Sequence, residues 1–521
     1  MNKKIFFITL LGLTVLLAAC VPQAQDEQAD IPPAAEVAVG GEVVWIANFD
    51  TVSLDPIRSN DASTADATTQ MMEGLTTFRG TGELEPLLAE SFVMLPDEYT
   101  WEFRLRQGII FHDGTPFNAE AVRRSLLRAL DPEEASPSAF IINMITDVEV
   151  IDDYTVHIIT EFPFAPLPSH LAHPVGFIIS PAALDEEAAG GRLVDENPVG
   201  TGPFVLYERV VGDRVRFVPF EDYWQGRANI DSLLFRTIPE ASTRVSMIET
   251  GEANVIVAQP FDVAVLENVP HLDMKLIIST AVTYIGFNTL REPFGDVRVR
   301  QALAMAINRE DILYGIQEGQ GVLAAGPLAP TVMHNATDVP TLPFDPARAR
   351  ALLEEAGFGE GDIEFTLLNI TGMAARTHMI ELIQANLADI GVIVHLDHTD
   401  LGSFLDVTAA GDFDTVILGW TTVTGDADYG VFSLFHSAHF GDAGNRTFYS
   451  NPAVDELLEA GRRSTDPAER DRIYREITEI LNYDVPKVFL FHPYHPIVIN
   501  GIGGLEVNFN SRPNFFNVYL Q

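Results

Sequence analysis

The sequence predicts an α/β protein with two or three domains. Segments with the pattern of strands and segments with the end signals of helices are interspersed along the whole chain, which favours α/β or α+β lobes. The 521 residues are 47% apolar, which is enough for more than one packed core. Cys20 is the single cysteine, so no disulfide can form within the chain and its stability must come from those cores.

The first twenty residues have the layout of an export signal. Lys3 and Lys4 precede an uncharged run over residues 5–17, and small residues lead to Cys20. This run is shorter than the about 20 residues that span a bilayer. The Leu-Ala-Ala-Cys ending resembles the lipobox of bacterial lipoproteins. The resemblance implies that residues 1–20 end in a lipidated Cys20, the first residue of the mature chain.

Composition and charge exclude some classes of binding partner for the mature chain. Residues 21–40 are rich in Pro, Ala, Gln, Asp and Glu, which predicts a disordered acidic tether. The whole chain has 74 acidic and 32 basic residues, a net charge of -42. Nucleic-acid binding needs a basic face, so we expect no nucleic-acid partner. We also expect contact with a membrane only through the lipid anchor.

From Gly41 onward, strand and helix signals follow each other. Residues 42–47 predict the first strand, and turn residues over 48–56 end it. Further strands are expected at 148–151, 155–160, 215–219, 233–237, 363–368 and 415–418. Three helices are predicted from their end signals: 242–250 before Gly251, one from Asp345-Pro346 to Gly357, and one from Asp466-Pro467 with Glu469 as a capping-box partner.

The sequence contains no catalytic motif of the common classes. It has no Gly-x-Ser-x-Gly, His-Glu-x-x-His, phosphate loop or dinucleotide fingerprint. The pairs His170/His173 and His492/His495 lie beside prolines, so no regular helix presents both rings of a pair to one metal ion. Residues 491–496 instead predict an extended, packed crossover. We therefore expect neither an enzyme nor a bound cofactor or metal.

The densest polar cluster spans residues 419–430 and follows the strand predicted at 415–418. Its candidate ligand-binding side chains are Trp420, Thr424, Asp426, Asp428 and Tyr429. Aromatic residues with polar tips suit a cleft that holds a small polar ligand. A carboxylate 4 Å from a ligand ammonium gains about 4 kcal/mol at a dielectric near 20, before desolvation. Two alternatives are that both carboxylates cap a helix expected to start near Val431, or that one caps it while the other faces the cleft.

Ordered motifs along the chain carry a family resemblance. They lie at 87–91, 99–106, 108–122, 198–204, 223–224, 286–288 and 293–303. Together they resemble the signature of family 5 extracellular solute-binding proteins, the peptide- and nickel-binding proteins of ABC importers. The resemblance covers nearly everything from Gly41 to the C-terminus. Within these motifs Trp101, Phe103 and Leu105 fit one face of a half-buried strand, so the motifs identify the scaffold.

The resemblance implies the type II, cluster C form of the periplasmic-binding-protein fold. Two lobes joined by crossing segments would close on a ligand by a hinge. The implied division is a lobe I core from 41–80, 201–285 and 493–521, an extra subdomain of lobe I over 81–200, and lobe II over 286–492.

Specificity follows from the same resemblance. Dipeptide and oligopeptide binders place an Asp three residues after the Trp, where it pairs with the peptide ammonium, and here that residue is Val423. The longer Gly-Trp-Thr-x-x-Thr-Gly-Asp-Ala-Asp-Tyr pattern is similar to the branch often labelled glutathione-binding, which implies that Asp426 or Asp428 takes the ammonium. For a ligand carboxylate the candidates are Arg376 and Arg58, with Asn60 beside the latter. A surface charge is the alternative for each Arg.

The sequence thus predicts a monomeric, lipid-anchored solute-binding subunit of an ABC importer for peptides, with glutathione-like peptides among its ligands. Its partners would be a membrane permease and the ATPase subunits. It would work outside the cytoplasm, on the outer face of the plasma membrane or in a periplasm. Two alternatives remain: a binder of nickel complexes, haem or an opine-like solute on the same fold, and a peptide-sensing receptor without transport.

Overall fold

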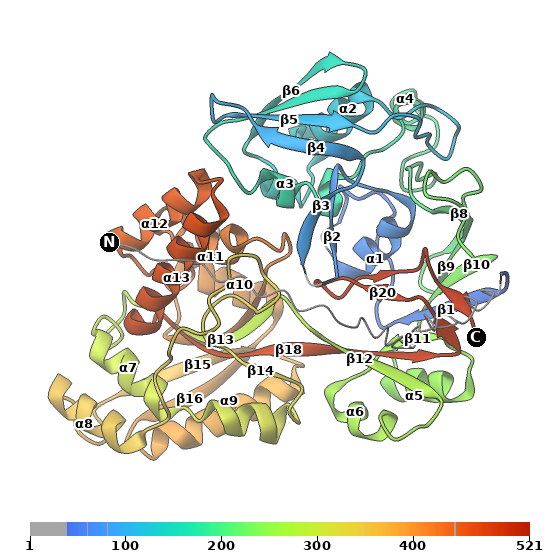
Figure 1. Cartoon of the computed structure of the whole chain (residues 1–521). Coiled ribbons are helices and arrows are strands. Elements are labelled where there is room, and N and C mark those ends of the chain that lie inside the picture. The colour runs from blue at the N-terminus through green and yellow to red at the C-terminus, as the bar shows by residue number, and fades with distance from the viewer. Residues whose placement is uncertain (1–38, 60, 81, 442–443) are drawn as a thin grey trace, which may run out of the picture. The chain divides into compact units, whose positions relative to one another are not determined.

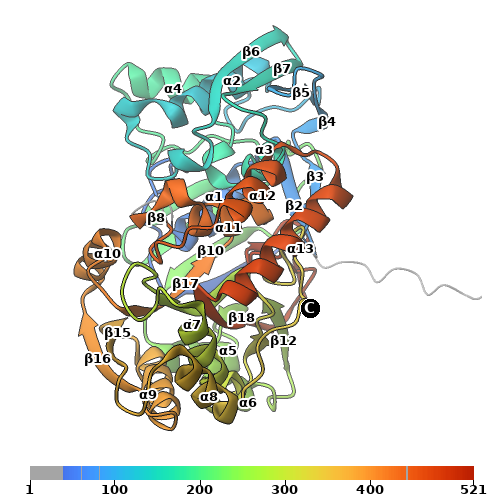
Figure 2. The ribbon, with the colours of Figure 1, turned by 90° about the vertical axis from the view of Figure 1, so that its left-hand side faces the viewer.

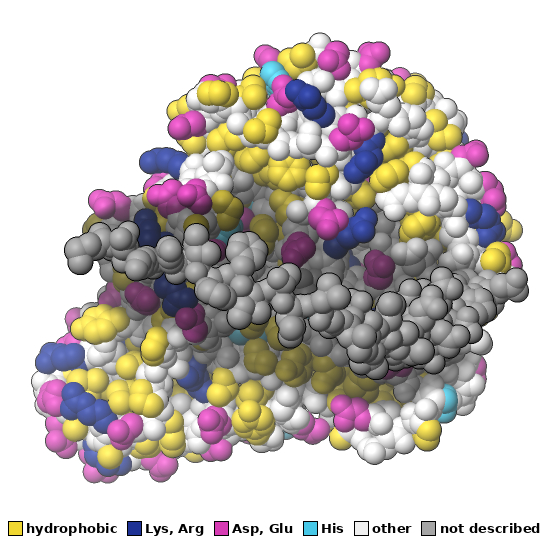
Figure 3. All heavy atoms as spheres, viewed as in Figure 1, with side chains coloured by type: hydrophobic (Ala, Val, Ile, Leu, Met, Phe, Trp, Pro, Cys, Tyr) yellow, Lys and Arg dark blue, Asp and Glu magenta, His cyan; other side chains and the backbone are white. Residues whose placement is uncertain are grey.

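The computed structural model describes residues 39–521 except positions 60, 81, 442 and 443. The predicted signal peptide, Cys20 and the tether up to residue 38 therefore lie outside the described residues, as does Asn60. Within the described part, no helix is both long and apolar enough to cross a membrane. Figure 3 shows acidic side chains scattered over the visible face rather than gathered in one patch.

We name lobe I the part built around one half of a large sheet. In spatial order its strands are β8 (Phe204–Val210), β9 (Arg214–Pro219), β10 (Ser232–Thr237), β1 (Glu42–Ala47) and β11 (Val255–Val257). β1 runs parallel to both β10 and β11. The helices of this lobe are α1 (Ala62–Met71), α5 (Ala241–Thr250) and α6 (Pro260–Leu266). The hairpin β2 (Thr76–Arg79) and β3 (Glu83–Pro86) follows α1, and the short strands β20 (Glu506–Val507) and β21 (Pro513–Asn514) lie near the C-terminus.

A second, four-stranded sheet forms a subdomain above lobe I (Figure 1). Its antiparallel strands are β4 (Ala89–Met94), β5 (Thr100–Leu105), β7 (Thr155–Thr160) and β6 (Ile145–Asp152), and its helices are α2 (Ala119–Leu130), α3 (Leu167–His170) and α4 (Pro181–Ala188). The predicted inner face of β5 is buried, with Trp101, Phe103 and Leu105 all at 6% exposure or less. Its hydrophobic core is continuous with that of lobe I.

We name lobe II the other half of the large sheet with its helices. Its strands, in spatial order, are β16 (Ile393–Thr399), β15 (Glu364–Ile370), β17 (Thr415–Thr421) and β13 (Ala281–Phe287), with the short β14 (Gly321–Leu323) beside them. Its helices are α7 (Val297–Ala306), α8 (Pro346–Ala356), α9 (Ala374–Ala388), α10 (Leu401–Ala410), α11 (Ala427–Phe435), α12 (Pro452–Arg463) and α13 (Pro467–Asp484). One core packs α7–α9 against this sheet and another packs α11–α13.

Two crossing segments join the lobes. The long strand β18 (Lys487–Asn500) pairs with β13 at its start and with β11 and β12 (Leu272–Ile278) at its end (Figure 1). The second crossing is the step from β12 to β13 through residues 279–280. The boundaries assigned from the sequence remain a proposal, because the two lobes share one continuous sheet.

Strand direction fixes where a ligand site is expected. β18 runs from lobe II into lobe I; β17 runs the same way, because both are antiparallel to β13. β1 runs the opposite way, because it is parallel to β11 and β11 is antiparallel to β18. The carboxyl ends of β17 and β1 therefore point toward the opposite lobe. In open α/β sheets, ligands bind outside the carboxyl ends of strands.

Most predicted elements are confirmed. β1 and β7 have the predicted bounds, and β6, β9 and β10 extend the predicted strands by one to three residues. α8 begins after the cap Asp345 and ends at Gly357. α5 ends at Gly251, whose φ of +80° a glycine adopts without strain. The predicted crossover over 491–496 lies within β18.

Three local predictions were wrong. β17 continues to Thr421, so Trp420 lies on a strand and not in a loop. α11 begins at Ala427 and not near Val431, because Asp426 accepts the backbone N–H of Asp428 and starts the helix. The capping box at α13 does not form: Ser464 donates to Glu469 and accepts from the backbone N–H of Asp466, where the box required Glu469.

Candidate ligand-binding site

An aromatic pair marks the end of β17 that faces lobe I. The rings of Trp420 and Tyr429 are stacked with centroids 5.5 Å apart, and the indole N–H donates to the backbone oxygen of Tyr429 at 3.3 Å. Tyr429 also lies 6.3 Å from the rings of Phe140 and His170 in the subdomain. Burial raises the pKa of Tyr429 to about 12, so its phenol stays protonated at neutral pH. These two candidate residues thus lie together where lobe II meets the subdomain.

Arg376 lies near the same end of β17, against Gly419. It comes from the first turn of α9, and a side-chain carbon placed on Gly419 would be 3.5 Å from its Nη2 atom. The guanidinium is half-buried, and no hydrogen bond or ion pair joins it to any residue that the structure describes. Burial lowers the pKa of Arg376, which the nearby Tyr284 only partly opposes. An unpaired guanidinium in this setting is suited to a ligand carboxylate.

Asp426, by contrast, is paired with another residue of the protein. Its side chain is 1% exposed and caps α11. Both carboxylate oxygens accept hydrogen bonds from Arg470, at 2.7 and 2.8 Å. Burial acts to raise the pKa of Asp426, but the charge and hydrogen bonds of Arg470 outweigh it, so the pKa lies below its usual range. The capping alternative considered from the sequence therefore applies to Asp426.

Asp428 also has an internal arginine. Its buried carboxylate accepts from Arg462 at 2.9 and 3.3 Å. The same guanidinium lies 3.2 Å from the ring centre of Phe432 and about 5.5 Å from Phe162 and Phe164 of the subdomain.

The backbone of Arg462 also forms a hydrogen bond between lobe II and the subdomain. Its oxygen accepts the N–H of Ala165 at 2.7 Å, where α12 meets the chain before α3 (Figure 2). We call this group, made of Asp428, Arg462 and the rings around them, the seam. Asp428 therefore fixes the position of Arg462, the residue that contacts the subdomain from lobe II.

The turn between the aromatic pair and the seam also touches lobe I. Thr424 is fully buried, and its hydroxyl has no hydrogen-bond partner among the described residues. Gly425 has a φ of +66°, and a side-chain carbon there would lie 2.4 Å from the ring of Phe509. Only glycine allows this close approach.

Arg58 already has partners within the protein. Its guanidinium donates to the backbone oxygen of Glu134 at 2.7 Å and to the carboxylate of the same residue. A further contact with Asp55 spans 3.5 Å. The side chain is 41% exposed, so it is a paired surface charge in this structure. Its predicted neighbour Asn60 is outside the described residues.

Sequence reasoning missed two charged residues of lobe I, Asp66 and Arg512. Asp66, on α1, lines a small hollow at the carboxyl ends of β1 and β10, with Phe49 and Thr51. No hydrogen bond or ion pair within 4 Å joins its carboxylate to another described residue. Burial raises the pKa of Asp66 to about 7; the charge of Arg512 lowers it and that of Asp61 raises it.

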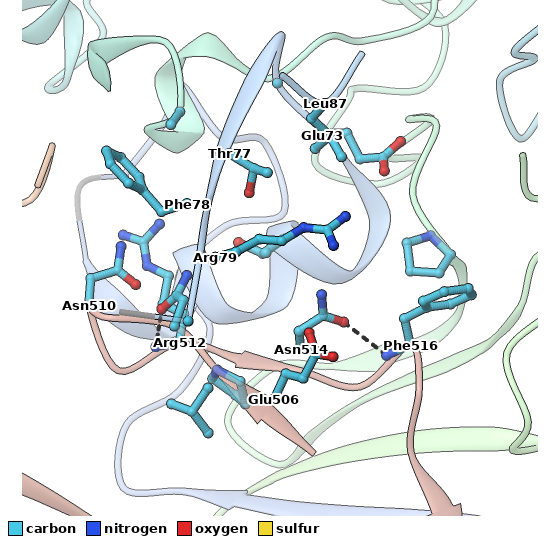
Figure 4. A pocket seen from close by; sticks show the side chains of 18 of the residues that line it. Glu73, Thr77, Phe78, Arg79, Leu87, Glu506, Asn510, Arg512, Asn514 and Phe516 are labelled. Atoms are coloured by element: carbon cyan, nitrogen blue, oxygen red, sulfur yellow. Dashed lines mark hydrogen bonds between the residues drawn. The ribbon is translucent and has the colours of Figure 1, made fainter. Parts of the chain in front are cut away.

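Arg512 comes from the C-terminal segment. Figure 4 shows it near Asn510 and Phe78, at the border of a lobe I hollow of about 570 Å³. Burial lowers the pKa of Arg512, and the charges of Asp66 and Asp61 oppose this shift. The described residues give its guanidinium no direct hydrogen-bond or ion-pair partner. No motif connects Asp66 with Arg512 in the sequence, and only the fold brings them together.

Comparison with known proteins gives consistent matches. The family model for bacterial extracellular solute-binding proteins, family 5 Middle, matches residues 83–442. The glutathione-binding protein GsiB of Pectobacterium atrosepticum is 34% identical over 446 residues, which are 84% of this chain and 86% of that protein. GsiB of Escherichia coli strain K12 is 33% identical over 488 residues, 92% of this chain and 91% of that protein.

Solved structures agree with these matches. HbpA2 from Haemophilus parasuis has a TM-score of 0.86 at 29% identity, covering 92% of this chain and 100% of that one. The periplasmic binding protein DppA from Helicobacter pylori, in complex with the peptide STSA, has a TM-score of 0.78 at 28% identity, covering 93% and 98%. Both similarities extend over both lobes and the subdomain.

Proposed function

The chain belongs to the family 5 bacterial extracellular solute-binding proteins, and on this premise we propose that it captures peptides between its lobes, with glutathione as the leading ligand, for an ABC importer. The observation that carries the proposal is the end of β17 that faces lobe I, where the Trp420–Tyr429 pair lies and where the unpaired Arg376 lies against Gly419. The GsiB relatives, named as glutathione-binding, support this choice of ligand.

The chemistry of the site suits a peptide of this kind. The stacked rings offer an apolar surface with polar edges, which is suited to a peptide backbone. The guanidinium of Arg376 offers parallel donors that match the two oxygens of a carboxylate. Glutathione carries two carboxylates, so its affinity should depend on at least one of them.

Anchoring and delivery complete the proposal. Cys20 would carry acyl chains, and two chains are about what stable membrane attachment requires. A tether over 21–40 would then hold the two lobes near a permease, which would recognise the closed form. A Cys20→Ser protein should bind ligand normally but leave the membrane fraction; retention on the membrane after salt washing would exclude the lipid anchor.

A ligand panel tests the capture of glutathione. Thermal unfolding of the purified protein is measured with glutathione, its glycine ethyl ester, alanyl-alanine and nickel–histidine. A ligand at 100 times its Kd stabilises a protein by about 2.7 kcal/mol, a clear shift in Tm. We expect the largest shift with glutathione and a smaller one with the ester. A shift with alanyl-alanine but none with glutathione would make the protein a dipeptide binder; a shift with nickel–histidine alone would support the nickel alternative.

A further inference from the structure

Among the described residues of the segment 419–430, no carboxylate is left unpaired for a ligand ammonium. The residue three positions after Trp420 is Val423. Asp426 is held by Arg470 and Asp428 by Arg462, each through two hydrogen bonds. Removing either arginine from its carboxylate would leave a buried charge unpaired, which is strongly unfavourable. A peptide's ammonium must therefore find its partner elsewhere.

Lobe I offers that partner at the matching edge of its sheet. Asp66 lies at the carboxyl ends of β1 and β10, which point toward lobe II as the end of β17 points toward lobe I. Its carboxylate has no direct partner in the described part of the chain, and the residue is half-buried beside the 70%-exposed Phe49. A half-buried carboxylate in this state gains most from an incoming cation.

Arg512 lies next to Asp66, because the side-chain amide of Gln70 donates to the backbone oxygens of both Asp66 and Pro513, at 3.0 and 2.9 Å. The charges of Asp66 and Arg512 interact, although no ion pair within 4 Å forms. Arg512 also lies near Phe78 (Figure 4), and the rings of Phe78 and Phe509 lie against the turn at Gly425 of lobe II. This side of lobe I therefore meets the turn that follows Trp420.

We propose that Asp66 binds the ligand's ammonium group from lobe I while Arg376 and Arg512 bind its two carboxylates. This inference rests on the proposed capture of glutathione, which carries one ammonium and two carboxylates. One free carboxylate and two free guanidinium groups complement that charge pattern. Because the charged ends of the ligand contact opposite lobes, only a ligand with both kinds of charge would hold the lobes closed.

A cycle of protein and ligand changes tests the assignment of Asp66. Kd is measured by calorimetry for glutathione and N-acetyl-glutathione, whose ammonium is removed, with wild type and Asp66→Asn. Charged hydrogen bonds predict an about 10- to 100-fold loss for either single change. We expect no further loss when both changes are combined. Retained binding of N-acetyl-glutathione also shows that the variant is folded.

Two controls separate the inference from the proposed function. Asp61→Asn removes a nearby charge but keeps a good helix cap, and should change Kd less than threefold. Arg512→Gln should weaken glutathione about tenfold or more. If wild type binds glutathione and Asp66→Asn binds it equally well, the inference is wrong and the proposed function stands. If wild type does not bind glutathione, both are wrong.

Discussion

The charged side chains at the two ends of the segment 419–429 differ in whether they have a partner within the protein. At the strand end, Gly419 lies against Arg376, whose guanidinium meets no carboxylate in the described structure. At the helix end, Asp426 and Asp428 are fully matched by Arg470 and Arg462. The carboxylates that looked suited to a ligand are thus paired within the fold, whereas Arg376 is the charge that we propose for the ligand. Residue type alone does not assign a role; the presence of an internal partner does.

Of the changes predicted here, breaking the Asp426–Arg470 pair should have the largest effect, and the quantity that it lowers is the free energy of unfolding. Asp426→Asn leaves the Arg470 guanidinium buried without its counter-charge, which costs about 3–5 kcal/mol of unfolding free energy. Urea unfolding measures the loss. The control is Glu476→Gln on the same helix, which breaks an exposed pair with Arg472 at 3.3 Å and should cost under about 1 kcal/mol. If Asp426→Asn loses no more unfolding free energy than the control variant, the Asp426–Arg470 pair does not stabilise the fold as we infer.

Changing the strand end should affect binding and leave stability unchanged. Arg376→Gln removes a charged contact to a carboxylate, so we expect Kd for glutathione to rise about 10- to 100-fold. Arg350→Gln is the control: this exposed arginine of lobe II donates only to the backbone oxygen of Asp389. Titration calorimetry gives both values. Equal affinities for the two variants would show that Arg376 does not contact the ligand.

The third prediction concerns pH and Asp66. Its folded-state pKa lies above the ordinary value, near 7, so its contribution to stability is full in acid and is lost as pH rises from about 4 to about 7. Asp66→Asn stays neutral and should therefore stabilise the free protein by about 1–2 kcal/mol at pH 8, allowing for its partial exposure. The gain should nearly vanish at pH 4. Arg512 and Asp61 are the charges that act on Asp66, and Asp61→Asn serves as the reference. A gain that is equal at pH 4 and pH 8 would exclude titration of Asp66 as its cause.

The smallest effect is expected at the seam. Arg462→Lys keeps the charge beside Asp428 but loses the planar contact with Phe432, Phe162 and Phe164. The closed form should lose about 1 kcal/mol, which raises Kd about 3- to 10-fold and enlarges the free protein in solution scattering. Arg463→Lys, at an exposed pair with Glu459, should do neither. Unchanged scattering and Kd for Arg462→Lys would show that the seam does not control closure.

Local signals in the sequence were sufficient for most of the fold. Asp345 and Gly357 delimit α8, and Gly251 ends α5, because caps act within one helical turn. The alternation of Trp101, Phe103 and Leu105 likewise predicts the buried face of β5, because this signal is also local in the sequence.

The site was harder to predict because its partners are distant in the chain. Arg470 lies two helices beyond Asp426, and the competition of Ser464 with Glu469 at α13 depends on detailed geometry. Asp66 and Arg512 come from opposite ends of the chain and match no motif. Trp420 and Tyr429 were each predicted as ligand-binding residues of one polar cluster, and the structure brings their rings into contact.

The most direct test of these ligand contacts is a crystal structure of the complex with glutathione. We predict one ligand carboxylate within about 3.2 Å of the Arg376 guanidinium and the ligand ammonium within about 4 Å of the Asp66 carboxylate. The Asp426–Arg470 and Asp428–Arg462 pairs should remain as they are here. An ammonium bound to Asp426 or Asp428, with its arginine displaced, would contradict the account.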